Sequence, residues 1–100
     1  MLHTVNKSPL ERNTLDSCLR LAAKGSAILL IEDGVYGALA GGQAAEKIGK
    51  RNGDIKFYAL GPDLAARGLS ETPLIDGIEV IDYEGFVDLA AEHEAQQAWL

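Results

Sequence analysis

The sequence predicts a small α/β domain, with a mostly parallel sheet of about four to five strands and helices on both faces. Along the 100 residues, short strand-like apolar segments alternate with segments whose apolar side chains recur at helical spacing. Residues 27–31 are apolar throughout, so both faces of this segment must be covered, as in the centre of a parallel sheet. Such alternation forms β-α-β units, whose right-handed crossovers place helices on both faces of the sheet.

A short strand and a helix open the chain. Residues 2–5 alternate apolar and polar side chains, as a strand does. Asn13 is a suitable N-cap for the helix, and Gly25 is a suitable end. Apolar side chains at helical spacing predict the inner face of this helix: Leu15, Cys18, Leu19, Ala22 and Ala23.

Two helical stretches follow the central strand. Glu32-Asp33-Gly34 ends the strand of residues 27–31. Helical stretches are expected at 35–40 and 43–49, with Gly41-Gly42 as a break between them.

The second half repeats the strand–helix alternation. A strand is expected at 55–60, followed by a short helix at 61–68. Another strand at 78–82 precedes an amphipathic helix at 83–94. Residues 99–100 are expected on a short tail.

Composition indicates one globular domain over residues 1–100. Apolar residues make up 47% of the chain and charged residues 24%. No apolar run approaches the roughly 20 residues that span a bilayer, and the first residues lack the apolar stretch of a signal peptide, so we expect a cytoplasmic protein without membrane contact. The single cysteine excludes an internal disulfide framework and a zinc site built from the chain's own cysteines.

Charge is distributed unevenly. All nine lysines and arginines lie at or before Arg67, and the residues beyond it carry eight carboxylates. The first part therefore has a net charge of +2 (nine basic, seven acidic) and the rest −8. The acidic part would repel a phosphate backbone, so direct nucleic-acid binding is not expected. It is interpreted as a solvated helix face, with an acidic docking surface as the alternative.

Cys18 is the only candidate sulfur nucleophile. A sulfur-carrying cysteine must be accessible and must have a lowered pKa, which nearby Arg12, Arg20 and Lys24 could provide. However, Cys18 lies on the same stripe of its helix as Leu15, and that stripe should face the sheet. The residues therefore favour a buried structural thiol over a catalytic one.

The turn after the central strand is a second candidate site. Glu32 and Asp33 lie where ligands of open α/β sheets bind, and paired carboxylates could hold a metal or transfer protons. The residues that follow lack the glycine patterns of phosphate-binding loops, so a helix-capping turn is favoured. His3 and His93 are far apart and have no further ligand at metal spacing, so we expect no metal site.

Four apolar side chains are candidates for an interface with partner subunits: Tyr36, Phe86, Trp99 and Leu100. A tryptophan and a leucine at the end of the sequence are costly to leave exposed. They either fold back onto the domain's own core or contact a partner.

Five segments, in this order and spacing, resemble the DsrH/TusB family, the smallest-subunit family of bacterial sulfur-relay complexes. They are LHTVNKSP at 2–9, ILLIEDGVYGAL at 28–39, YALGPDLAARG at 58–68, IDYEGFVDL at 81–89 and QAWL at 97–100. The resemblance covers nearly the whole chain and implies a compact α/β fold like that of the DsrEFH subunits.

The resemblance also implies partners. DsrH-like proteins assemble with DsrE/TusD-like and DsrF/TusC-like subunits into a heterohexamer that passes persulfide sulfur to a DsrC/TusE-like acceptor, without a metal or cofactor. The established sulfur-carrying cysteine belongs to the DsrE/TusD-like subunit. DsrH-like members carry a cysteine that matches Cys18, which favours this subtype and a role in sulfur oxidation.

Three alternatives remain. A TusB-like subunit would supply sulfur for 2-thiolation of the tRNA wobble uridine. A wholly structural subunit would help to assemble the complex without catalysis. A stand-alone binder of a small ligand would use the Glu32–Asp33 turn.

Overall fold

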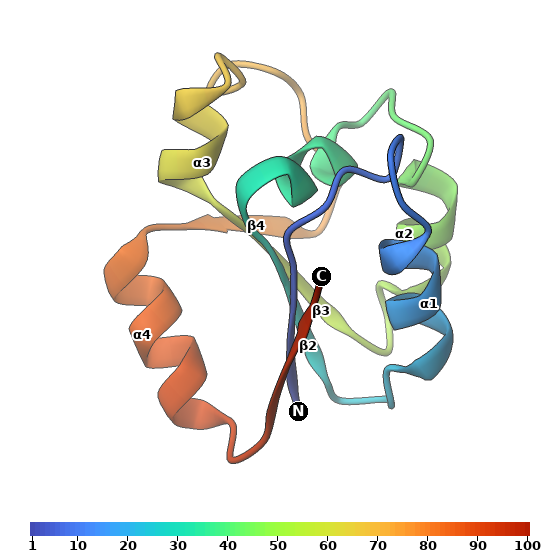
Figure 1. Cartoon of the computed structure of the whole chain (residues 1–100), viewed down its shortest axis with the longest axis vertical. Helices are drawn as coiled ribbons and strands as arrows, with labels where there is room; N and C mark the ends of the chain where they lie inside the picture. Colours follow the sequence, from blue (N-terminus) through green and yellow to red (C-terminus); the bar gives the residue numbers. More distant parts are fainter.

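Five parallel strands form the sheet of this protein, in the order β4-β3-β2-β1-β5 (Figure 1). A computed structural model describes all residues, 1–100. The strands are β1 (Leu2–Val5), β2 (Ala27–Leu30), β3 (Lys56–Leu60), β4 (Ile78–Ile81) and β5 (Gln96–Trp99). The helices are α1 (Thr14–Leu21), the 3₁₀-helix η1 (Glu32–Ala38), α2 (Ala45–Arg51), α3 (Gly61–Ala66) and α4 (Tyr83–Glu92).

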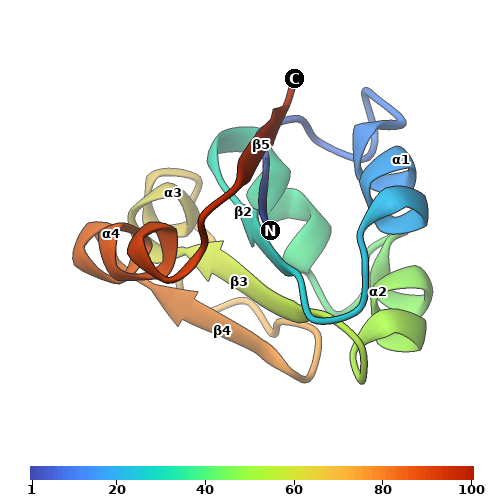
Figure 2. The same ribbon diagram turned by 90° about the horizontal axis from the view of Figure 1, so that it is seen from below.

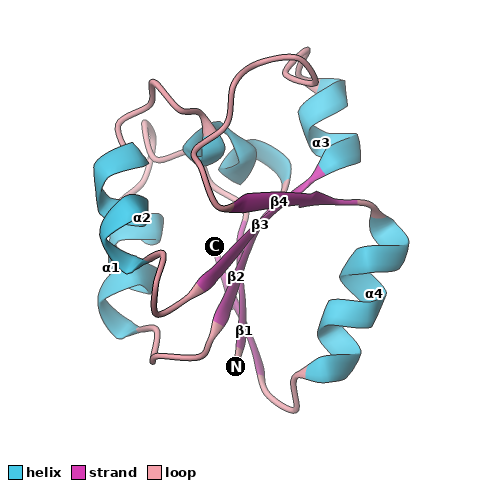
Figure 3. Ribbon diagram, turned by 180° about the vertical axis from the view of Figure 1, so that it is seen from behind, coloured by secondary structure: helices cyan, strands magenta, loops and turns pink.

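The path of the chain places helices on both faces. From β1 to β4 each strand lies beside the previous one, and the chain then returns through α4 to β5 on the far side of β1. This reversal puts α4 on the opposite face from α1 and α2, because all the crossovers share one hand (Figure 2). Figure 3 shows α4 on one side of the sheet and α1 with α2 on the other. The predicted α/β fold class is confirmed.

The larger of two apolar clusters lies under α1 and α2. Its 16 buried residues include Cys18 and Leu19 of α1, Val35 of η1, Ile48 of α2 and Phe57 of β3. β2 is buried along its whole length, as its continuous apolar sequence predicts. The core is therefore thickest between the sheet and the α1–α2 layer.

The smaller cluster lies under α4. Five buried residues form it, among them Leu2 of β1, Leu29 of β2 and Leu89 of α4. Phe86 and Ala90 of α4 pack against this cluster. A single helix thus covers this face, and the outer side of α4 is exposed.

Three expectations about local structure are wrong. Trp99 does not lie on a tail, because it is the last residue of the edge strand β5, which pairs with β1. Ala23 does not belong to the inner face of α1, which ends at Leu21 and leaves Ala23 exposed. Glu32–Gly34 does not simply end β2, because it forms the first turn of η1.

The first two differences have a physical reason. β5 is an edge strand, so its side chains are mostly exposed and it lacks the apolar pattern of a buried strand. The backbone at Ala22 is extended, so the helical spacing that relates Ala23 to Leu19 no longer applies.

No helix in the structure has both the length and the apolar character that crossing a membrane requires.

Candidate functional site

The Glu32–Asp33 turn lies at the carboxyl end of β2 and is tied to α3. The backbone N–H of Glu32 donates a hydrogen bond to the Asp63 carboxylate across 2.7 Å. The Arg67 guanidinium donates a hydrogen bond through Nε to Asp33 Oδ1 at 3.0 Å, and its Nη2 forms an ion pair with the same oxygen at 2.9 Å. A second terminal nitrogen of Arg67 donates to the Asp63 carbonyl at 3.1 Å. These contacts neutralise Asp33 and fix η1 against α3.

The backbone of this turn is unusual. Glu32 has a φ of 49°, the left-handed region that side chains other than glycine rarely adopt. Gly34 follows, and a Cβ atom there would lie 2.1 Å from the carbonyl oxygen of Val5. The positive φ of Glu32 and the missing side chain of Gly34 therefore allow η1 to lie close to the end of β1. This geometry supports the capping-turn interpretation over a catalytic pair of carboxylates.

Cys18 is fully buried in the larger apolar cluster. Burial raises the pKa of its thiol to about 12, although the positive charge of Arg51 acts in the opposite direction. With this pKa the thiolate fraction at neutral pH is of the order of 10⁻⁵. A nucleophilic cysteine needs the thiolate and access to solvent, and here Cys18 has neither. The position of Cys18 supports the structural interpretation of the only thiol.

Trp99 and Leu100 behave differently from each other. Trp99 is half-buried, packs against the larger cluster and donates its indole N–H to Nδ1 of His3 across 3.0 Å. The rings of Trp99 and His3 are tilted by 39°. Leu100 remains 78% exposed. Trp99 thus folds back onto its own domain, whereas Leu100 is free to contact another chain.

Tyr36 and Phe86, the other two interface candidates, lie on different elements. Tyr36 is half-buried in η1. Phe86 is half-buried beneath α4, where it packs against the smaller cluster. The four candidates therefore come from η1, α4 and the end of β5, and each side chain retains some exposed surface.

The sequence and the fold of this chain can both be compared with those of known proteins. The family model described as "DsrH like protein" matches residues 7–96. The chain belongs to the DsrH-like protein family.

Named relatives of this DsrH-like chain extend over its whole length. "Protein TusB" of Shigella flexneri is 44% identical over 99 residues, which are 99% of this chain and 100% of that protein. "Protein TusB" of Escherichia coli strain K12 is 42% identical, and that of Pectobacterium parmentieri is 40% identical, over the same shares of each chain. The names fit the TusB-like alternative better than the DsrH-like subtype that Cys18 favours.

Solved structures share the DsrH-like fold. The ychN protein from E. coli superposes with a TM-score of 0.80 at 21% identity, covering 98% of this chain and 97% of that chain. Protein Tm0979 from Thermotoga maritima gives a TM-score of 0.65 at 28% identity, covering 94% and 95%. The resemblance seen in the sequence is thus confirmed at the level of family and fold.

Two surfaces of this DsrH-like chain were not predicted. Tyr83 and Val87, one turn apart on α4, are 61% and 67% exposed. The amphipathic pattern over residues 83–94 predicts a helix, but it does not show which residues of a single covering helix remain outside. The second surface is a cationic groove between α1 and α2, whose side chains come from distant parts of the sequence.

Proposed function

We propose that this chain is a TusB-like subunit of a cytoplasmic sulfur-relay complex, which passes persulfide sulfur between carrier proteins and supplies it for 2-thiolation of the tRNA wobble uridine. The observation that carries the proposal is the match of 40% to 44% identity with proteins named TusB along 99 residues. Because the match covers each of these relatives completely, the comparison applies to the full length of the TusB proteins and not to a part of them.

Within that complex, the role of this chain is structural. Relay chemistry is the attack of a thiolate on a persulfide sulfur, so the carrier needs an accessible, ionised cysteine. Cys18 is buried and its pKa is raised to about 12. The sulfur-carrying cysteine therefore belongs to a DsrE/TusD-like partner, and Cys18 serves as a core side chain.

Exposed apolar side chains supply the contacts with partners. Leu100, which follows β5, and the Tyr83–Val87 pair on α4 are apolar side chains that lie mostly in water. Such areas are typical of surfaces that another chain covers. Tyr36, Phe86 and Trp99 are half-buried, so each offers part of its side chain to a partner while the rest packs inside the domain.

Sulfur oxidation by a DsrH-like subunit is the second candidate function. The presence of a cysteine at position 18 favours it. A stand-alone ligand binder is disfavoured, because Arg67 already neutralises Asp33 and the Asp63 carboxylate already accepts the N–H of Glu32.

Co-expression tests the assembly. The chain is produced with the DsrE/TusD-like and DsrF/TusC-like proteins of the same organism, and the mass of the purified assembly is measured by native mass spectrometry. We expect a complex that contains all three chains, which Val87→Asp and Leu100→Asp weaken. Leu10→Asp, which changes an equally exposed leucine far from α4 and β5 in the sequence, is the matched control. Partners that assemble fully without this chain would contradict the proposal.

A further inference from the structure

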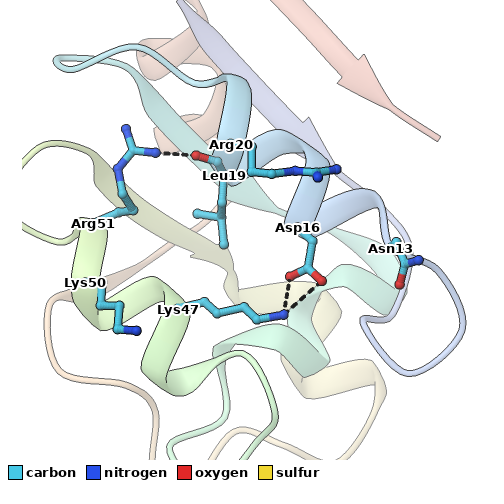
Figure 4. Close-up of a pocket in the computed structure, with 7 residues that line it drawn as sticks. All are labelled: Asn13, Asp16, Leu19, Arg20, Lys47, Lys50 and Arg51. Carbon is cyan, nitrogen blue, oxygen red and sulfur yellow. Dashed lines mark hydrogen bonds and ion pairs between the residues drawn. The ribbon is translucent and has the colours of Figure 1, made fainter.

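A groove with a volume of about 530 Å³ runs between the outer faces of α1 and α2 (Figure 4). Four fixed cations, one carboxylate and one apolar side chain line most of it: Arg20, Lys47, Lys50, Arg51, Asp16 and Leu19. α1 contributes Asp16, Leu19 and Arg20, and α2 contributes the other three.

The groove concentrates positive charge on an acidic protein. It holds four of the chain's nine lysines and arginines, with Asp16 as the only acid in its lining. The lining therefore carries a net charge of +3, whereas the whole chain carries −6. The remaining residues thus carry −9. Such a separation of charge sets up a strong local field that attracts negative groups to the groove.

Two of the four cations have structural roles. Arg51 donates through one terminal nitrogen to the Leu19 carbonyl and through the other to the Ala22 carbonyl, the latter at 2.9 Å, so it caps the end of α1. Lys47 binds both oxygens of Asp16, at 2.8 Å and 2.9 Å, and so links α1 to α2.

The other two cations have no comparable partner. Arg20 reaches only the Ser17 hydroxyl of its own helix, at 3.4 Å. Lys50 makes one exposed pair with Glu46, at 3.5 Å, and such pairs contribute little to stability. Arg20 and Lys50 lie in the last turns of α1 and α2, where a cation complements the helix dipole. Because like charges gathered in one groove also repel each other, their charge remains available to a negatively charged ligand.

We propose that this groove docks a short acidic segment of a partner protein, with aspartate or glutamate side chains placed between Arg20 and Lys50. Exposed, flexible cations on two neighbouring helices suit carboxylates spaced along a peptide. A nucleic acid fits less well, because its phosphates would continue past the groove onto a surface of net charge −9. The inference is independent of sulfur relay.

Asp16 distinguishes acidic docking from a purely structural role of these side chains. It is the negative group that the groove already holds, and it occupies Lys47. An incoming carboxylate must compete with Asp16 for Lys47 and is repelled by its charge. Asp16→Asn should therefore weaken the link between α1 and α2 and yet strengthen acidic binding. A purely structural salt bridge would not produce this second effect.

NMR titration of the ¹⁵N-labelled full-length chain tests the proposal. The probe is a short synthetic peptide with a glutamate at every fourth position, and the control peptide carries glutamine there. We expect the glutamate peptide to shift the backbone amides of α1 and α2, with an affinity that falls as salt rises. Arg20→Gln and Lys50→Gln should each weaken binding about two- to five-fold, and Asp16→Asn should strengthen it by a similar factor.

Matched controls separate docking from general charge. Lys56→Gln removes the same charge from an exposed position on β3, outside the groove, and should leave the affinity nearly unchanged. The amide spectrum and melting temperature of each variant show that it is folded. Equal binding of both peptides, equal effects of Lys56→Gln and Lys50→Gln, or tighter binding of a single-stranded RNA oligonucleotide than of the glutamate peptide would overturn the proposal.

Discussion

The indole N–H of Trp99 donates a hydrogen bond to Nδ1 of His3 across 3.0 Å and joins the last strand of the sheet to the first. Parallel pairing already aligns the two strands, with Val5 opposite Trp99 and His3 opposite Gln97. The side-chain bond adds a specific contact on the core side of an otherwise exposed edge strand. Trp99 thus fastens the last strand to the rest of the domain. From the sequence alone, the same residue is a candidate for an interface with a partner.

Trp99→Phe should destabilise the protein. The change keeps an aromatic ring but removes the donor, so Nδ1 of the buried His3 loses its partner. We expect the free energy of unfolding to fall by about 1 kcal/mol. Urea denaturation followed by circular dichroism measures it. An unchanged midpoint would show that the bond between Trp99 and His3 contributes nothing to stability.

Stability should also depend on the protonation of His3. Burial, and to a smaller extent the N-terminal ammonium group, lower the pKa of His3 below the ordinary histidine value of 6.5. Between the folded pKa and 6.5 the unfolded chain binds more protons, so stability rises with pH in this window. The contribution is complete above pH 6.5 and is lost as the pH falls toward the folded pKa.

Urea denaturation between pH 5.5 and 7.5 tests this dependence. His3→Gln keeps an acceptor for the indole but does not titrate, so its stability should vary less with pH over this range. A variant that follows the wild-type pH profile would assign the dependence to other groups.

Gly34→Ala should be among the most damaging small substitutions. The new Cβ would lie 2.1 Å from the Val5 carbonyl oxygen, a backbone atom that cannot move without disturbing β1. We expect a loss of about 3 kcal/mol or more in the free energy of unfolding. Gly49→Ala is the matched control, because its Cβ meets nothing within 4 Å inside α2. This control should raise stability by about 0.5 to 1 kcal/mol.

Glu32→Gly should stabilise the protein despite the loss of a side chain. Glu32 has a φ of 49°, which is costly for any residue with a Cβ. Glycine removes this cost, and its greater freedom in the unfolded chain offsets only part of the gain, which leaves up to about 1 kcal/mol. Thermal unfolding measures the change. Glu84→Gly, at a helical position of α4, should instead lower stability, and equal losses in both variants would refute the role of backbone strain.

The sequence predicts best where burial determines the pattern. The apolar run around β2, the helical stripe that buries Cys18 and the final amphipathic helix lie where predicted, except that the stripe does not reach Ala23. β5 was missed because Gln96 and Gln97 lie on an exposed edge, where backbone pairing with β1 replaces apolar burial. Periodicity cannot detect a strand that is held in this way.

The sequence predicts surfaces less well. Arg20 and Lys50 lie in different helices, and only the packing of α1 against α2 brings their charges to one groove. Likewise, the Arg67–Asp33 contact joins residues 34 positions apart. The EDGVYGA segment is recognisable in the sequence, but its role in holding η1 against β1 and α3 emerges only from the fold.

Mass spectrometry after incubation with a persulfide donor tests the central claim, that this subunit shapes a relay complex without carrying sulfur. The native chain is treated alone and together with its co-purified partners, and Cys18→Ser is treated in parallel. We predict that the mass of one added sulfur atom is found on a partner subunit, and that Cys18→Ser does not change it. An added sulfur on this chain, lost in Cys18→Ser, would contradict the account and make Cys18 a carrier.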